Sequence, residues 1–188
     1  ITDLKYYGGQ GNIDGNVYSV AFSADGNGFV IGGAFSRYAW KYVIEEGVPK
    51  FDDVIYKDAL HGEELNGTVY ALSYNTVKDI LIVGGGFDGK ASLFSGFSTG
   101  ISMPSYVSDI VANSSALDGD VSTIAINNQG TAFVLGGNFT GKAAFFDINA
   151  SAASFVAYLT KNGESLNGMV SAAAFSESGV CVAIGGIF

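Results

Sequence analysis

The only histidine of the chain, His61, is the first residue whose side chain could take part in catalysis, and it lies in an acidic segment. Asp58 precedes it, and Glu63 and Glu64 follow it closely. An imidazole acts as a general base when a second group orients it, but no nucleophile is spaced around His61 in the pattern of a catalytic triad. We therefore predict that segment 57–64 is a solvated contact loop, and we predict no catalytic residue.

Metal ligands are equally sparse. A single His and a single Cys, Cys181, exclude a structural zinc site with four N or S ligands from one chain. Calcium needs about six to eight oxygen ligands, and the acidic residues nearest His61 lack the spacing of a calcium-binding loop. The sequence predicts no metal and no cofactor, and it predicts a buried Cys181 because this residue lies in the apolar run 180–184.

Carboxylate pairs for glycoside hydrolysis stay open as an alternative, because their separation in space decides that chemistry. Aromatic side chains could stack on sugar rings, but we expect them to pack between sheets instead. The candidates for such stacking are Tyr6, Tyr7, Trp40 and Tyr42.

Four Asn-X-Ser/Thr sequons suggest N-glycosylation and hence a location outside the cell or on its surface, with a cytoplasmic location as the alternative. Asn113 and Asn149 fall in expected loops and are the better acceptors. Asn66 occupies an Asn/Asp-Gly turn, which explains it without a glycan. Asn138 falls in a Gly-Gly-X-Phe element, where we expect it to be hindered.

Charge and hydropathy exclude two classes of partner. The chain has 188 residues, with 18 acidic and 9 basic side chains and a net charge of −9, so its field repels a phosphate backbone. No apolar run approaches the roughly 18 residues that span a bilayer. We predict a protein or glycan partner, no nucleic acid and no transmembrane span.

A fourfold repeat organises the chain. Its frames begin near residues 13, 65, 117 and 166, so that successive copies lie 52, 52 and 49 residues apart. Each copy opens with Asn or Asp followed by Gly and ends its second apolar run with Gly-Gly-X-Phe, as in 84–87. A fixed period near fifty is typical of a propeller or a repeat array.

Each copy predicts an antiparallel four-stranded blade. The first strand alternates small residues on one face with large ones on the other, as at Ala71 and Leu72, which suits the crowded centre of a propeller. The second strand is apolar throughout, as in 80–83, so both of its faces should be covered. We interpret each Gly-Gly pair as a demand of blade packing, because no helix follows to make a phosphate-binding loop.

These repeats resemble known propeller families. Segment 20–26 is similar to the first hairpin of WD-type repeats, and Phe146-Asp147 stands where those repeats have Trp-Asp. The Gly-Gly ending also resembles kelch repeats. The closest resemblance is to the Asn/Asp-Gly-X-Val…Gly-Gly-X-Phe repeats of bacterial surface proteins and of the fungal cortical polarity-marker family. It implies an extracellular interaction module and no catalytic residue.

We thus predict an all-β fold in which residues 1–188 are a single β-propeller segment of about 3.5 four-stranded blades, part of a larger propeller. Residues 1–12 are expected to supply an outer strand of a preceding or closing blade. Other chains or segments could complete the last blade. The predicted function is a non-enzymatic structural or interaction module; the alternatives are a propeller enzyme with catalytic groups partly outside this segment, and an intracellular WD-like scaffold.

Overall fold

The computed structural model describes residues 12–58, 63–149 and 152–188. Within those ranges every regular element is a β-strand, which confirms the all-β fold class. The described ranges accordingly hold no helix that is long and apolar enough to cross a membrane.

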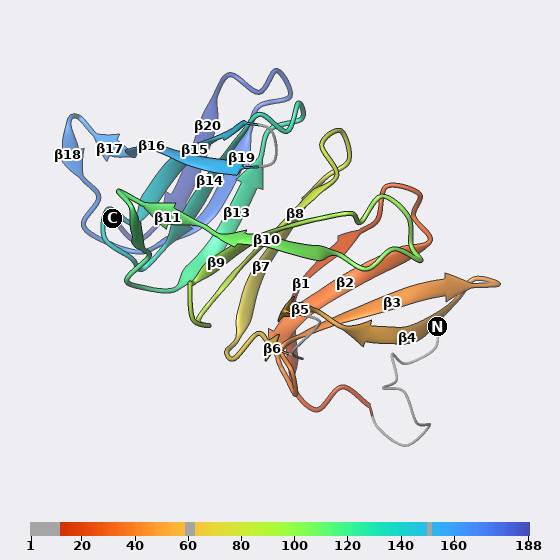
Figure 1. Ribbon diagram of the computed structural model, residues 1–188. Helices are drawn as coiled ribbons and strands as arrows, with labels where there is room; N and C mark the ends of the chain where they lie inside the picture. Colours follow the sequence, from red (N-terminus) through yellow and green to blue (C-terminus); the bar gives the residue numbers. More distant parts are fainter. Residues whose placement is uncertain (1–11, 59–62, 150–151) are drawn as a thin grey trace.

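Four sheets follow one another along the chain as blades A to D (Figure 1). Blade A contains β1 (Asn16–Phe22), β2 (Gly28–Ala34), β3 (Ala39–Glu45) and β4 (Val48–Val54). Blade B contains β7 (Val69–Asn75), β8 (Ile80–Gly85), β9 (Ala91–Ser95) and β10 (Ser105–Asp109). Blade C contains β13 (Val121–Ile126), β14 (Ala132–Gly137), β15 (Ala143–Asn149) and β16 (Ala152–Tyr158), and blade D contains β19 (Val170–Phe175) and β20 (Val182–Gly186). All neighbouring strands within a blade are antiparallel, as predicted.

Short two-stranded hairpins link one blade to the next. They are β5 (Tyr56–Asp58) with β6 (Glu63–Glu64), β11 (Val111–Ala112) with β12 (Ser115–Ala116), and β17 (Thr160–Lys161) with β18 (Glu164–Ser165). The predicted loop 57–64 is therefore partly wrong: its described ends pair as a hairpin, because Tyr56 lies opposite Glu64 and Asp58 opposite Glu63. His61 lies outside the described residues.

The inner strands β1, β7, β13 and β19 lie side by side, which is the arrangement of a propeller. The predicted division into small and large faces is confirmed, since Ala21 and Val30 of blade A belong to the same core as Val69 and Leu72 of blade B. Each blade thus presents small residues to the large residues of the next blade. Three core clusters lie between neighbouring blades and a fourth lies on blade A alone; all of them stabilise the array by removing apolar surface from water.

Each pair of glycines serves two different contacts. A Cβ on Gly84 would lie 2.6 Å from Cγ1 of Val121 in blade C, whereas a Cβ on Gly85 would lie 2.0 Å from the carbonyl oxygen of Thr68 in its own blade. The first glycine leaves room for a side chain of the next blade, and the second leaves room for the backbone of a β-bulge between Val69 and Ala71. The same bulge recurs at the start of each inner strand. The prediction that blade packing requires the Gly-Gly pairs is confirmed.

Blade D departs from the sequence-based expectation at one residue. Cys181 is exposed, so its predicted burial is wrong. The reason is that β20 pairs only with β19, and the outward face of this two-stranded sheet meets no further blade among the described residues. The expected outer strand in residues 1–12 falls almost wholly outside the described residues.

Candidate functional site

Recurring side-chain clamps close the turn between the second and third strand of each complete blade. The partners are Asp14 with Ser36, Asn66 with Asp88, and Asp118 with Thr140. In the third clamp, the backbone N–H of Thr140 donates to Oδ1 of Asp118 at 2.7 Å, and the Thr140 hydroxyl donates to Oδ2. These bonds lower the pKa of the Asp118 carboxyl. Because the clamp repeats in every complete blade, we assign it to the scaffold.

The bulge residue of each inner strand reaches toward the neighbouring inner strand at the axis. Tyr18 and Tyr70 bring their ring centroids to 5.6 Å, and the Tyr18 ring is half exposed. At the equivalent position of blade C, the Ser122 hydroxyl donates to the carbonyl oxygen of Val170 at 2.7 Å. The two tyrosines form an open aromatic surface beside the axis, of the kind that packs against the C–H face of a sugar.

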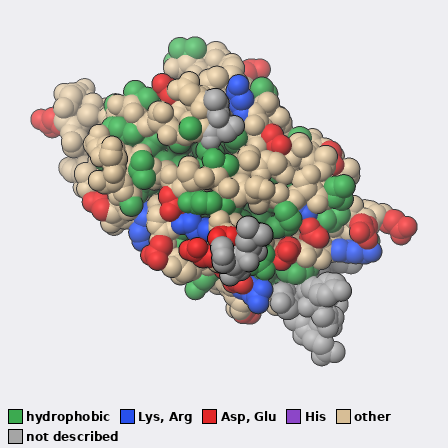
Figure 2. Space-filling model, in the orientation of Figure 1, with side chains coloured by type: hydrophobic (Ala, Val, Ile, Leu, Met, Phe, Trp, Pro, Cys, Tyr) green, Lys and Arg blue, Asp and Glu red, His purple; other side chains and the backbone are tan. Residues whose placement is uncertain are grey.

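Ion pairs connect successive blades at the end of the propeller where the inner strands begin. Figure 2 shows acidic and basic side chains side by side along one rim of the molecule. The pairs, which we call the rim cluster, are Arg37 with Glu64, Lys57 with Asp109, and Lys90 with Asp120. Every cation of the rim cluster thus already has a carboxylate partner.

Lys57 is the most enclosed member of the rim cluster. Its Nζ lies 2.8 Å from Oδ1 of Asp109, donates to the Asp88 carbonyl oxygen at 3.1 Å, and lies 5.6 Å from the Tyr106 ring centroid. Asp109 also accepts a hydrogen bond from the Ser92 hydroxyl at 2.7 Å. With its partners saturated, this pair can hold β5 against blade B but has little capacity for a ligand.

Lys90 and Asp120 form a partly exposed pair of the rim cluster. Lys90 Nζ lies 3.3 Å from Oδ1 of Asp120 and 3.3 Å from the Gly86 carbonyl oxygen. The Asp120 side chain is 47% exposed. Asp120 immediately precedes β13, so its carboxylate lies at the axial mouth, and an ammonium group has three N–H donors to share. The pair can accept a proton on one side and stabilise negative charge on the other.

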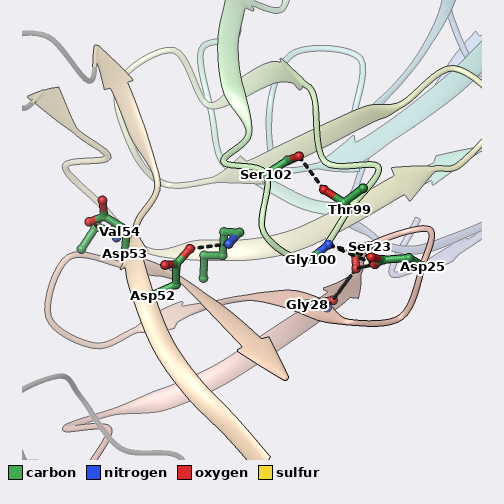
Figure 3. A network of polar contacts seen from close by, with 10 residues as sticks. Ser23, Asp25, Gly28, Asp52, Asp53, Val54, Thr99, Gly100 and Ser102 are labelled. Carbon is green, nitrogen blue, oxygen red and sulfur yellow. Dashed lines mark hydrogen bonds and ion pairs between the residues drawn. The ribbon is translucent and has the colours of Figure 1, made fainter. Parts of the chain in front are cut away.

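A second polar network, drawn in Figure 3, lies at the opposite end of the inner strands. Asp25, in the β1–β2 turn, accepts hydrogen bonds from the Ser23 hydroxyl at 2.7 Å and from the Gly100 N–H at 3.0 Å. These hydrogen bonds, the Ser23 hydroxyl first, lower the pKa of Asp25 to about 2. Gly100 belongs to the loop 96–104 between β9 and β10, so the network holds blade B against blade A. We read it as structural.

Two hollows of about 240 Å³ lie beside the linking hairpins at equivalent places. One is lined by Asn113, Thr140 and Tyr158, and the other by Lys161, Asn167 and Phe188. Both fall below the roughly 300–1,000 Å³ of ordinary ligand pockets. Two features near the starts of the inner strands are left as candidates, the Lys90–Asp120 pair and the Tyr18–Tyr70 surface.

The predicted contact loop is only partly described. Asp58 lies in β5, Glu63 and Glu64 lie in β6, and Glu64 reaches Arg37 at 3.4 Å. No group of three His, Cys, Asp or Glu residues that could hold a metal occurs among the described residues. Contact by this segment stays a prediction.

The sequons lie in different surroundings. The amide of Asn66 accepts from the Asp88 N–H at 2.9 Å and donates to Oδ2 of Asp88 at 2.7 Å, so its predicted turn role is confirmed. Asn113 is exposed in the β11–β12 turn with φ of 50°. Asn138 is exposed rather than hindered, and its Oδ1 accepts from Lys142. Asn149 is exposed at the end of β15, and its sequon runs into residues outside the described ranges. Glycosylation stays a prediction.

The predicted packing of the aromatics between blades is wrong where they are described. Trp40 and Tyr42 are buried, but they pack on Phe51 and other side chains of their own blade A, on the face that meets no further blade among the described residues. Tyr6 and Tyr7 lie outside the described residues. Sequence reasoning missed Tyr18, Tyr70, Lys90 and Asp120. The repeat frame could have indicated Asp120, because Asn16, Thr68, Asp120 and Met169 share the position just before the first valine of each inner strand.

Comparison with known proteins places the fold. No family model and no curated protein matches the sequence. Among solved structures, the chain is similar to a 6-phosphogluconolactonase candidate from Bacteroides uniformis, with a TM-score of 0.66, 14% identity, and 96% of this chain covering 50% of that one. It is also similar to the periplasmic gluconolactonase of Pseudomonas aeruginosa, with a TM-score of 0.63, 14% identity, and coverage of 90% and 47%. A chain of the mitotic checkpoint complex gives a TM-score of 0.60 at 15% identity, with coverage of 94% and 48%.

These similarities confirm a β-propeller, and the chain spans about half the length of the structures it matches. They do not reveal which repeat family it belongs to. The prediction of a non-enzymatic module is corrected here, because two of these neighbours carry lactonase names and favour the alternative of a propeller enzyme. The sequence-based prediction rested on the repeat motifs, and these motifs describe the scaffold rather than any catalytic residue.

Proposed function

We propose that this chain is part of a propeller enzyme that hydrolyses the ring ester of a sugar lactone, with Asp120 and Lys90 at its axial mouth and further groups supplied from outside these 188 residues. The single observation that carries the proposal is the open Lys90–Asp120 pair, an exposed carboxylate and an ammonium group 3.3 Å apart at the mouth of a lactonase-like propeller. The lactonase names of two structural neighbours support the choice of substrate class.

The proposed chemistry needs one base and one site for negative charge. The Asp120 carboxylate accepts a proton from a water molecule that attacks the lactone carbonyl carbon. Negative charge develops on the carbonyl oxygen, and an N–H of Lys90 that is free of Asp120 stabilises it. The ring C–O bond then breaks, and the leaving oxygen takes up the proton that Asp120 accepted, which gives the open hydroxy acid and restores the Asp120 carboxylate.

The surroundings favour an uncharged sugar ring. Tyr18 and Tyr70 offer their faces to its C–H groups. The net charge of −9 also repels an anionic substrate and favours release of the acid product. We therefore propose an unphosphorylated lactone.

A location outside the cytoplasm is part of this proposal. The four sequons support it. One structural neighbour is named as periplasmic, which agrees with the same location.

Hydrolysis of D-glucono-1,5-lactone by the purified chain tests the proposal. In a pH-stat, the chain should release acid faster than the uncatalysed ring opening, and Asp120→Asn should lower kcat by about 100-fold or more, as for loss of a general base. Asp147→Asn, the same change at an exposed position of β15 in blade C, should leave the rate unchanged. Gluconate, the stable product, should shift the NMR signals of Lys90 and Asp120. Because the proposal places further groups outside these 188 residues, ligand binding decides it: absence of gluconate-induced shifts at both Lys90 and Asp120 would refute the proposal.

A further inference from the structure

One position of the linking hairpins differs between equivalent copies. The strand pairing aligns Lys57 of β5, Ala112 of β11 and Lys161 of β17. Lysine therefore stands at this position in two of the three described hairpins, and alanine stands there in the third. The exception lies between blades B and C, where both neighbouring blades have all four strands.

Lys57 shows what this position does when it holds a lysine. Its Nζ lies 2.8 Å from Oδ1 of Asp109, donates to the Asp88 carbonyl oxygen at 3.1 Å, and lies 5.6 Å from the Tyr106 ring centroid. The Lys57 side chain is only 13% exposed. An alkyl chain thus crosses from the hairpin to blade B, and its ammonium group ends in a cage of carbonyl, carboxylate and aromatic groups.

At Ala112 the same place is a hollow of about 240 Å³. Its walls are equivalent to the surroundings of Lys57, because blades B and C share one register. The equivalent residues are Tyr158 for Asp109, Thr140 for Asp88, and Asp118 for Asn66. The hollow is therefore the space that a lysine side chain fills one blade earlier, which also explains why it is smaller than an ordinary ligand pocket.

The hollow keeps groups that attract a cation. Hydrogen bonds from Thr140 lower the pKa of the Asp118 carboxyl, so Asp118 is ionised near neutral pH and its oxygens have further lone pairs to accept with. The Tyr158 ring forms another wall, and the face of an aromatic ring attracts cations. None of the described residues that line this hollow is Lys or Arg. The net charge of −9 favours a cation in the same sense.

We propose that this hollow binds the primary ammonium end of an alkyl chain, supplied by a lysine side chain of a partner protein or by a free alkylamine. The ammonium group donates to the Thr140 carbonyl oxygen and the Asp118 carboxylate, and the alkyl chain lies between Ala112 and Tyr158. The repeat carries the proposal, because the molecule holds such a group in the equivalent place one blade earlier. This inference does not depend on the proposed lactone chemistry.

Titration of the isotope-labelled chain with n-butylammonium chloride, followed by NMR at constant ionic strength, tests the proposal. We expect saturable shifts of the amide signals of Asn113, Thr140 and Tyr158. 1-Butanol, which has the same length without the charge, and glucose should cause no such shifts at the same concentration. Nα-acetyl-lysine N-methylamide separates the two sources of the ammonium group. Matching shifts with this probe assign the site to a protein lysine, whereas shifts with n-butylammonium alone assign it to a free amine.

Variants show whether the hollow itself binds the ammonium group. Ala112→Lys should abolish the shifts, because the new side chain fills the hollow as Lys57 fills the equivalent place, and lysine at this position is compatible with the fold in two other hairpins. Val77→Lys is the matched control: it adds the same charge at an exposed position of blade B and should leave the titration unchanged.

Asp118→Asn gives an independent measurement of the cation preference. It should raise the dissociation constant of n-butylammonium by about tenfold or more, since a hydrogen bond to a charged group is lost. The equivalent Asn66 keeps its clamp with Asp88, so asparagine at 118 should keep the fold. Absence of shifts, equal shifts with 1-butanol or glucose, or undiminished shifts in Ala112→Lys would overturn the proposal. Lactone turnover is measured separately, so loss of one proposal leaves the other standing.

Discussion

Three consecutive glycines in blade B allow a sharp test of how the blades pack. A Cβ on Gly84 would meet Cγ1 of Val121 in blade C at 2.6 Å. A Cβ on Gly85 would meet the Thr68 carbonyl oxygen at 2.0 Å, and one on Gly86 would meet only a carboxylate oxygen of Asp120 at 3.3 Å. None of the three has a positive φ, so alanine is penalised by contacts alone.

The magnitudes follow from what has to move. Val121 is fully buried and can yield only by disturbing the boundary between blades, so Gly84→Ala should lower the free energy of unfolding by about 1–3 kcal/mol. Gly85→Ala clashes with backbone that forms the β-bulge, and it should cost more than about 3 kcal/mol. At Gly86 the carboxylate can rotate away, and alanine should be neutral or stabilise by about 0.4–1 kcal/mol.

Urea unfolding followed by far-UV circular dichroism measures all three variants. Gly86→Ala is the matched control, because the equivalent positions in the other blades carry Ala34, Asn138 and Ile187. The expected order of destabilisation is Gly85, then Gly84, then Gly86. If Gly85→Ala unfolds at the same urea concentration as the wild type, the proposed close approach is refuted.

Three further changes test individual side chains. Tyr42→Phe should stabilise by about 1–3 kcal/mol in urea, because this hydroxyl is buried without a hydrogen-bond partner among the described residues and burial raises its pKa to about 12. Hydrogen bonds from Thr140 lower the pKa of Asp118 below 3.8, so the ionised carboxylate stabilises the fold above that pH and this stabilisation is lost on acidification. Between about pH 6 and pH 3, the melting temperature of Asp118→Asn should therefore fall by less than that of the wild type. Asp52→Asn should lower the free energy of unfolding by about 3–5 kcal/mol, because it leaves the buried Lys41 ammonium unpaired. Lys41→Leu leaves only the partly exposed carboxylate of Asp52 and should change this free energy little. Equal losses in the two variants would contradict this reasoning.

The repeat made most of the fold predictable from the sequence. A Gly-Gly pair follows the second apolar run in every copy, as at Gly84 and Gly85. This recurrence predicted close packing, because a position that is glycine in every copy has no room for a side chain. Alternation of small and large residues, as at Ala71 and Leu72, predicted which face meets the next blade. These inferences succeeded because a repeated unit makes the same contact each time.

Features that occur once were beyond the sequence. Burial of Cys181 was predicted from its apolar neighbours, but exposure depends on whether another blade covers β20. The pairing of Lys57 with Asp109 joins residues 52 positions apart, and only the packed fold brings them together. The loop 96–104, which holds Asp25 through Gly100, replaces a short turn in blade B alone.

The contrast between repeated and single residues also indicates where catalytic residues should be sought. A residue that recurs in every blade is explained by packing, whereas a residue that differs from its equivalents at an accessible position is not. The position just before the first valine of each inner strand holds Asn16, Thr68, Asp120 and Met169 in the four copies, so the scaffold tolerates each of them. Only Asp120 is ionisable there, and it meets the Lys90 ammonium from the preceding blade. The departure from the repeat and the open ion pair therefore single out the same residue by independent routes.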